Sequence, residues 1–178
     1  MDITPERPHH PATPHTEAEL ASLIRLLTEL TPHVRTVTIG HGRDVASRAA
    51  ASAFAEAWQA RGGTVLARVD WPEDAASWLR PARRLTAQTP DAWVIAAAVP
   101  GFAHLARRLR RSTGFDPART VAFASLADPR LPALTGPGTL DGLHGATPDG
   151  GTWEVPGGRL TSRQPAGQSE EFDASGNS

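Results

Sequence analysis

The residues best placed to do chemistry lie in residues 40–44, which read Gly-His-Gly-Arg-Asp. A β-branched run precedes them, and Asp44 is a suitable N-cap for the helical pattern that follows. His41 and Arg43 would then lie between a strand and a helix N-terminus, where backbone amides and the helix dipole favour negative charge. The segment predicts a carboxylate or phosphate site. The alternative is an ordinary polar loop in which Asp44 itself occupies the amides.

Three other loops are expected to reach the same place, because ligands bind beyond the carboxyl ends of parallel strands. They are residues 70–74 (Asp-Trp-Pro-Glu-Asp), 100–102 (Pro-Gly-Phe) and 125–128 (Ser-Leu-Ala-Asp). Together these loops could build a binding site. They could also build a small catalytic site in which His41 is a base oriented by Asp70 or Asp128. The residue types alone leave both readings open.

Other chemistries fit the residue pattern poorly. Residues 40–42 match the start of a dinucleotide fingerprint, but Val45 stands where its third small residue should be. Asp70, Glu73 and Asp74 match no metal-ligand spacing, and Asp74 has an ordinary role as a helix cap. We therefore expect no nucleotide, no metal and no other cofactor.

The composition removes several further classes of protein. All 18 basic residues are arginines, and the 178 residues include no Lys, Cys or Tyr. Thiol nucleophiles, disulfides, Cys-type zinc sites and lysine Schiff bases are therefore excluded. A formal net charge of −1 argues against a nucleic-acid partner. No stretch approaches the about 20 apolar residues of a membrane span, and residues 1–15 lack the apolar run of a signal peptide. We expect a cytoplasmic protein without a membrane partner.

Alternating periodicities predict the elements that position these loops. Apolar residues spaced three and four apart predict helices over residues 17–30, 45–58, 74–87 and 102–113. β-Branched and apolar runs predict strands over 34–39, 64–69, 93–99 and 120–125, with a weaker fifth over 142–146. This alternation predicts an α/β fold, a three-layer α/β/α sandwich whose parallel sheet has strand order 2-1-3-4-5. Residues 93–99 should form its centre, buried on both faces.

A single domain is expected over residues 16–152. Residues 1–15 are rich in Pro and His, and residues 153–178 are rich in Gly, Ser and acidic side chains, so both segments are predicted to be disordered. The first helix, over residues 17–30, carries a wide leucine stripe behind a capping box made by Thr16 and Glu19. That stripe must be buried either against the sheet or against a second copy of the chain.

The order of the segments resembles a known family. The residues that carry the resemblance are VTIGHGRDVASRAAASAFAEAWQARGGTVLARVDWPED, PDAWVIAAAV, LARRLRRSTGF and GTLDGLHGATP. Each alone is a generic strand or helix. Together, over about residues 34–148, they resemble the second lobe of type 1 periplasmic binding proteins, the leucine-binding-like receptors of amino-acid ABC transporters. The chain departs from that pattern in having one lobe, and in having His41 where the family's turn carries an aromatic residue.

The resemblance implies a small-molecule-binding or interaction module rather than an enzyme. The ligand expected is small and anionic or zwitterionic. The resemblance implies that His41, Pro100, Gly101 and Asp128 face it, and Gly42 and Arg43 of the first turn complete the predicted site. A small enzyme centred on His41 is one alternative. A scaffold that binds a protein partner through the four arginines of residues 107–111 is another, since blocks of like charge often mark interaction surfaces.

Overall fold

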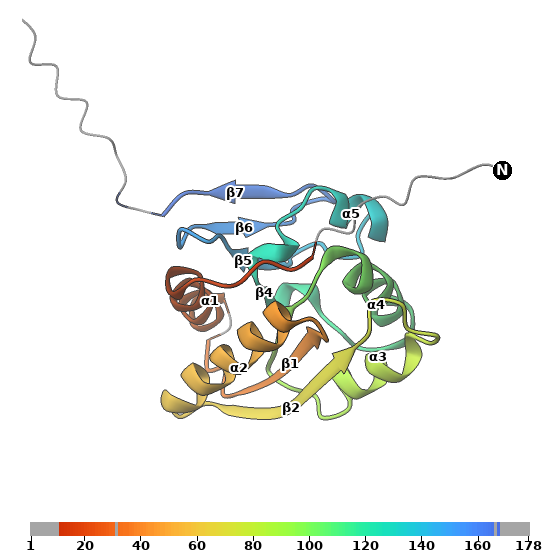
Figure 1. Ribbon diagram of the computed structural model, residues 1–178, viewed down its shortest axis with the longest axis horizontal. Coiled ribbons are helices and arrows are strands. Elements are labelled where there is room, and N and C mark those ends of the chain that lie inside the picture. Colours follow the sequence, from red (N-terminus) through yellow and green to blue (C-terminus); the bar gives the residue numbers. More distant parts are fainter. Residues whose placement is uncertain (1–10, 31, 166, 168–178) are drawn as a thin grey trace, which may run out of the picture.

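Seven strands form one mixed sheet in the order β2-β1-β3-β4-β5-β6-β7 (Figure 1). The computed structural model describes residues 11–30, 32–165 and 167. The first five strands pair in parallel and the last two are antiparallel. The strands are β1 Thr36–Gly42, β2 Thr64–Trp71, β3 Ala92–Ala96, β4 Thr120–Ala122, β5 His144–Ala146, β6 Thr152–Glu154 and β7 Thr161–Arg163. The predicted parallel order 2-1-3-4-5 is confirmed, within a larger sheet than expected.

Helices cover both faces of the sheet, which confirms the predicted three layers (Figure 1). One face carries α1 Glu17–Leu30 and α2 Val45–Ala60. The other carries α3 Leu79–Thr86, α4 Val99–Ser112 and α5 Arg130–Thr135. Two short 3-10 turns, Pro117–Arg119 and Ala124–Leu126, flank β4. Among the described residues, no helix is both long enough and apolar enough to cross a bilayer.

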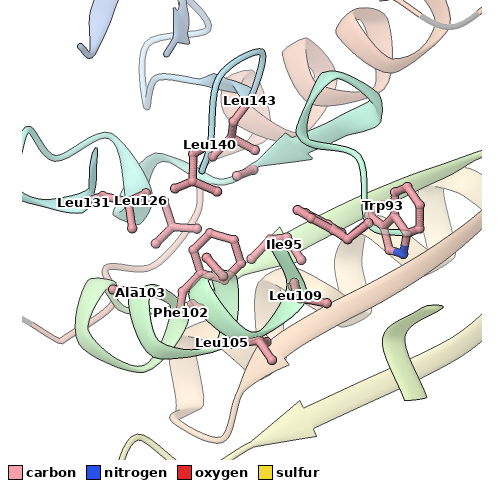
Figure 2. Close-up of a cluster of buried hydrophobic side chains, with 14 of the residues drawn as sticks. Trp93, Ile95, Phe102, Ala103, Leu105, Leu109, Leu126, Leu131, Leu140 and Leu143 are labelled. Carbon is pink, nitrogen blue, oxygen red and sulfur yellow. The ribbon is translucent and has the colours of Figure 1, made fainter. Parts of the chain in front are cut away.

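Strand β3 lies at the centre of the molecule, as predicted. All five of its residues are buried. Successive side chains point to opposite faces of a strand, so Ile95 joins the core under α3 and α4 while Val94 joins the core under α1 and α2. Figure 2 shows Ile95 among side chains of α4 and of the segment before β5, with Phe102, Leu109 and Leu140 nearby. An apolar run of this kind is stable only because both faces are covered.

Helix α1 buries its leucine stripe against the sheet. Leu23 and Leu27 are 0% and 1% exposed and belong to the core shared with β1, β3 and α2. The capping box forms, because the Glu19 amide donates to Thr16 Oγ1 at 3.1 Å and the Thr16 amide donates to Glu19 Oε2 at 3.3 Å. The prediction that the stripe is buried against the sheet is thus confirmed. The stripe gives no reason for a second copy of the chain.

Several element boundaries differ from those predicted. Strand β1 runs from Thr36 to Gly42, so His41 is a strand residue and not a loop residue. Helix α3 begins at Leu79 and not near Asp74, and Pro81 lies in its first turn, where an amide proton has no helical partner. Strand β3 ends at Ala96, and α4 begins at Val99.

The folded domain extends past the predicted boundary at residue 152. Strands β6 and β7 add a hairpin to the sheet beside β5, and Trp153 and Val155 are each 1% exposed. The prediction of disorder is therefore wrong for residues 153–163. Residues 11–15 of the N-terminal segment also contact the domain, since the Thr13 amide donates to Ser125 Oγ at 2.9 Å. The rest of the two predicted tails, residues 1–10, 166 and 168–178, lies outside the described residues.

Asp91 fixes the start of β1 and makes folding stability depend on pH. Its carboxylate accepts from the backbone amides of Arg35 and Thr36 at 2.9 and 2.8 Å, and these bonds hold the pKa of Asp91 below its usual value. A group with a lowered folded pKa stabilises above its unfolded pKa of about 4 and loses that effect as pH falls through the folded value. Asp91→Asn should therefore cost about 1–2 kcal/mol at pH 7 and progressively less below pH 4, by urea unfolding. Asp74→Asn, in an exposed turn, is the control, and equal pH profiles for the two variants would contradict this assignment.

Candidate functional site

Three strand ends meet at the carboxyl edge of the sheet, as the sequence predicted. His41 lies opposite Asp70 of β2 on one side and Ala96 of β3 on the other. Side-chain contacts then tie the following segments together: Arg43 reaches β2, and Glu73 reaches the start of α4. The edge therefore combines the end of β1, the end of β2 and the turn after it, and the N-terminus of α4.

His41 is 8% exposed, and its Nδ1 lies 2.7 Å from the carbonyl oxygen of Gly42. A carbonyl oxygen only accepts, so Nδ1 carries the proton in this bond. The Asp70 carboxylate accepts from Arg43, and the Asp128 carboxylate accepts from Arg130.

Arg43 is paired with Asp70. Its Nε donates to Asp70 Oδ2 at 2.7 Å, and this bond holds the pKa of the Asp70 carboxyl below its usual value. Both side chains are well exposed, at 53% and 39%. An exposed pair of this kind contributes little to stability and can exchange partners, so Arg43 remains able to meet an incoming carboxylate.

The chain's own carboxylates occupy the backbone amides that would otherwise hold an anion. Asp44 accepts from the Ser47 amide at 2.9 Å and caps α2. Glu73 Oε2 accepts from the Gly101 amide at 2.7 Å at the start of α4. After β4, Glu19 Oε1 accepts from the Ala124 amide at 2.6 Å, although burial raises the pKa of Glu19. A carboxylate or phosphate would have to displace these groups, which disfavours the anion site predicted on the amides.

Gly42 lies against a tight cluster of polar groups, closed to solvent in this structure, which we call the recess. A Cβ on Gly42 would lie 2.8 Å from Asp44 Oδ2, 3.4 Å from Ser47 Oγ and 3.5 Å from Glu73 Oε1. Asp44 Oδ2 and Ser47 Oγ are buried and have no hydrogen-bond partner within the described part of the chain. Ser47 is itself only 1% exposed. Buried oxygens without a partner are rare, so the recess favours an incoming N–H or O–H donor.

Gly101 has a specific reason to be glycine. A Cβ at this position would lie 2.6–2.8 Å from the Glu73 carboxyl group. The close approach of Glu73 to the start of α4 therefore depends on the absent side chain. Pro100 precedes it in the first turn of α4, where proline is tolerated.

The structure brings together His41, Gly42, Arg43, Pro100 and Gly101. Asp128 is bound to Arg130, which donates to both of its oxygens. Sequence reasoning missed Ser47, and it named Glu73 only as part of the loop of residues 70–74 and as a possible metal ligand. Within residues 11–30, 32–165 and 167, no group of three His, Asp or Glu side chains could hold a metal ion. The recess could have been suspected from the sequence, because Gly42 lies two residues before the helix cap Asp44.

The chain matches one known protein family. The model of the family described as periplasmic binding protein matches residues 4–161. A comparison with curated protein sequences found no match.

Solved structures share the fold at low sequence identity. A putative branched-chain amino acid ABC transporter protein from Rhodospirillum rubrum is 19% identical, with a TM-score of 0.60 over 72% of this chain and 36% of that one. A leucine binding protein from Thermotoga maritima is 18% identical, with a TM-score of 0.58 over 71% and 36%. A solute binding protein from Rhodopseudomonas palustris, solved with 3,4-dihydroxy benzoic acid, is 15% identical, with a TM-score of 0.58 over 73% and 35%. The chain thus spans about a third of the length of these proteins.

Proposed function

Because the chain belongs to the periplasmic binding protein family, whose model matches residues 4–161, we propose that it is a lobe that binds a small ligand at the carboxyl ends of β1, β2 and β3. The resemblance seen in the sequence, to one lobe of leucine-binding-like receptors, is confirmed by the family match and the shared fold. Binding without catalysis is part of the proposal. It is supported by the match to a family of binding proteins and by the bond from His41 Nδ1 to a backbone carbonyl.

The expected cytoplasmic localisation is wrong. The matching family and the similar solved structures are periplasmic or extracellular binding proteins. The expectation depended on the composition of residues 1–15. In a chain that spans about a third of its relatives' length, that composition is no guide to export.

The recess beside Gly42 carries the proposal about ligand class. It offers the buried oxygens of Asp44 and Ser47 to a donor, with the negative charge of Glu73 close by. An ammonium group supplies three N–H donors and a positive charge, so it satisfies these oxygens better than a neutral or anionic group does. Arg43, at the mouth of the same edge, can exchange Asp70 for a ligand carboxylate. A zwitterion with adjacent ammonium and carboxylate groups fits both requirements.

Two of the similar solved structures are associated with ligands of different kinds. Leucine carries both an ammonium and a carboxylate, whereas 3,4-dihydroxy benzoic acid carries a carboxylate and no amine. For this chain, the recess favours a ligand that carries both an ammonium and a carboxylate group. We therefore propose a small amino acid or a similar zwitterion as the ligand.

Three compounds with the same side chain test this proposal: leucine, 3-methylbutylamine and 4-methylpentanoate. Binding to one lobe buries only part of a ligand, so we expect weak affinity, measured as a rise in Tm at millimolar ligand. Leucine should raise the Tm most, the amine less and the acid least. A rise with 4-methylpentanoate equal to that with leucine would overturn the ammonium assignment, and no rise with any of the three would overturn leucine-like ligands.

Asp44→Asn should weaken binding of the zwitterion by about tenfold, because it removes a charge-assisted hydrogen bond. Asparagine is as good an N-cap as aspartate, so α2 should stay folded. Asp74→Asn changes the net charge equally in a turn near the recess and should leave the Kd unchanged. Isothermal titration of both variants measures the difference, and equal weakening in both would show only a general charge effect.

A further inference from the structure

The outer surface of α3 and α4 is a second feature of the molecule, and the ligand site does not use it. Figure 1 shows the two helices side by side on one face of the sheet. Together they present seven exposed guanidinium groups, which we call the arginine face: Arg80, Arg83, Arg84, Arg107, Arg108, Arg110 and Arg111. We infer that this face docks onto an acidic protein surface.

The charge of the arginine face is not neutralised within the described part of the chain. None of its seven side chains makes a hydrogen bond or an ion pair with a described residue. Four arginines elsewhere in the described part of the chain do pair with acids, for example Arg25 with Glu29 and Arg43 with Asp70. Between residues 75 and 115 the only acidic residue is Asp91, and its carboxylate is bonded to the start of β1.

Unneutralised charge of this density has a cost within each helix. Arg80 and Arg84 lie four residues apart, as do Arg107 and Arg111, and each like-charge pair at this spacing destabilises a helix by about 0.2–0.5 kcal/mol. Since the formal net charge of the whole chain is −1, the rest of the molecule must carry a clear excess of negative charge. The concentration of positive charge is therefore local to this face and complementary to a partner rich in carboxylates.

The arginine face also contains an anchor point. The rings of Trp78 and His104 stack with centroids 5.5 Å apart and planes 14° from parallel. Together with Arg107, Arg108 and Arg111 they line a hollow of about 130 Å³. That volume accepts one side chain. Trp and Arg are the residues most enriched at binding hot spots, and a guanidinium matches a carboxylate with two parallel hydrogen bonds.

A protein surface fits this face better than a membrane does. Helices that bind bilayers insert large apolar side chains between the headgroups. The large hydrophobic residues exposed in the described part of the chain are Val45 and Leu134, and neither belongs to α3 or α4. Trp78 is half-buried and packs on the core under α3 and α4. The face therefore offers charge and a shallow hollow, without a residue to insert.

Trp78 gives a direct readout of occupancy. The other four tryptophans are at most 3% exposed, so iodide in solution should quench Trp78 selectively. We use poly-L-glutamate of about 20 residues as the carboxylate probe and phosphatidylglycerol vesicles as the membrane probe. Poly-L-glutamate should protect Trp78 from iodide, and salt should weaken this protection.

Two variants of equal net charge locate the binding surface. Arg107→Glu/Arg108→Glu/Arg111→Glu should raise the Kd for labelled poly-L-glutamate at least tenfold, measured by fluorescence anisotropy. The control Arg48→Glu/Arg61→Glu/Arg159→Glu changes three exposed arginines elsewhere and should change the Kd less than threefold. If the first variant fails to fold by circular dichroism, the corresponding triple Gln variant replaces it, with a triple Gln control.

An equal loss of affinity for poly-L-glutamate in the two triple variants would overturn the proposal, because net charge alone would then explain binding. Binding of wild type to the vesicles without binding to poly-L-glutamate would also overturn it, in favour of a membrane. Asp44→Asn should leave binding of poly-L-glutamate unchanged. A failure of this inference is therefore separable from a failure of the ligand proposal.

Discussion

Replacement of Trp153 by alanine should lower the free energy of unfolding by about 3–5 kcal/mol. The indole is 1% exposed and packs in the core that contains Leu140, Leu143 and Val155. Its Nε1 donates to the Ala146 carbonyl at 3.1 Å, so truncation also leaves a buried acceptor without its partner. Urea unfolding followed by circular dichroism measures the loss.

The control for Trp153 is an exposed apolar residue. Leu134 is 52% exposed, and Leu134→Ala should change stability by less than about 0.5 kcal/mol. A loss below 1 kcal/mol for Trp153→Ala would mean that the β6–β7 hairpin contributes no packed core. It would restore the domain boundary that composition predicted at residue 152.

Gly40→Ala should cost about 1–3 kcal/mol through overpacking. A Cβ at Gly40 would lie 2.8 Å from Leu85, 2.9 Å from Trp71 and 3.1 Å from Ile95. All three side chains are fully buried, and β1 is held between β2 and β3 by hydrogen bonds on both sides. Neither the strand nor its neighbours can move aside easily.

Gly114→Ala is the matched control for Gly40→Ala. Nothing lies within 4 Å of the position its Cβ would take. Alanine there should be neutral or should stabilise by up to about 1 kcal/mol, by reducing the freedom of the unfolded chain. Thermal and urea unfolding of both variants measure the contrast. Equal stability of the two would show that α3 does not pack closely on β1.

The sheet was predictable because its central strands have strong patterns. The apolar run at β3 and the β-branched run at β1 identify buried parallel strands, and the helices between them give the strand order. The β6–β7 hairpin was not predictable. Its strands are three residues each, and the burial of Trp153 depends on packing against Gly145, a contact that no local pattern reveals.

The sequence pointed to a structural role for Gly40 but suggested the wrong reason for the glycine. The sequence suggested that it ends a strand, whereas it lies inside β1 where Trp71 and Leu85 approach the backbone. The same limit applies to the candidate site. The meeting of three strand ends followed from topology, but the bond from Gly101 to Glu73 depends on side-chain geometry across 28 residues of sequence. Spacing along the chain cannot give such a contact.

The position of α1 has a consequence for biosynthesis. This helix is made well before β4 and β5, on which it packs, and Glu19 and its partner Ala124 are 105 residues apart. At about 5–20 residues per second, translation of that interval takes about 5–20 s, during which the part of α1 that packs on β4 and β5 is not yet covered by them. The nascent chain therefore presents an apolar helix well before its binding surface exists. Such a helix is a natural target for chaperones that bind newly made polypeptides. The contacts of α1 with β4 and β5, which would displace a chaperone, join residues that are among the most widely separated in the sequence of any pair in contact.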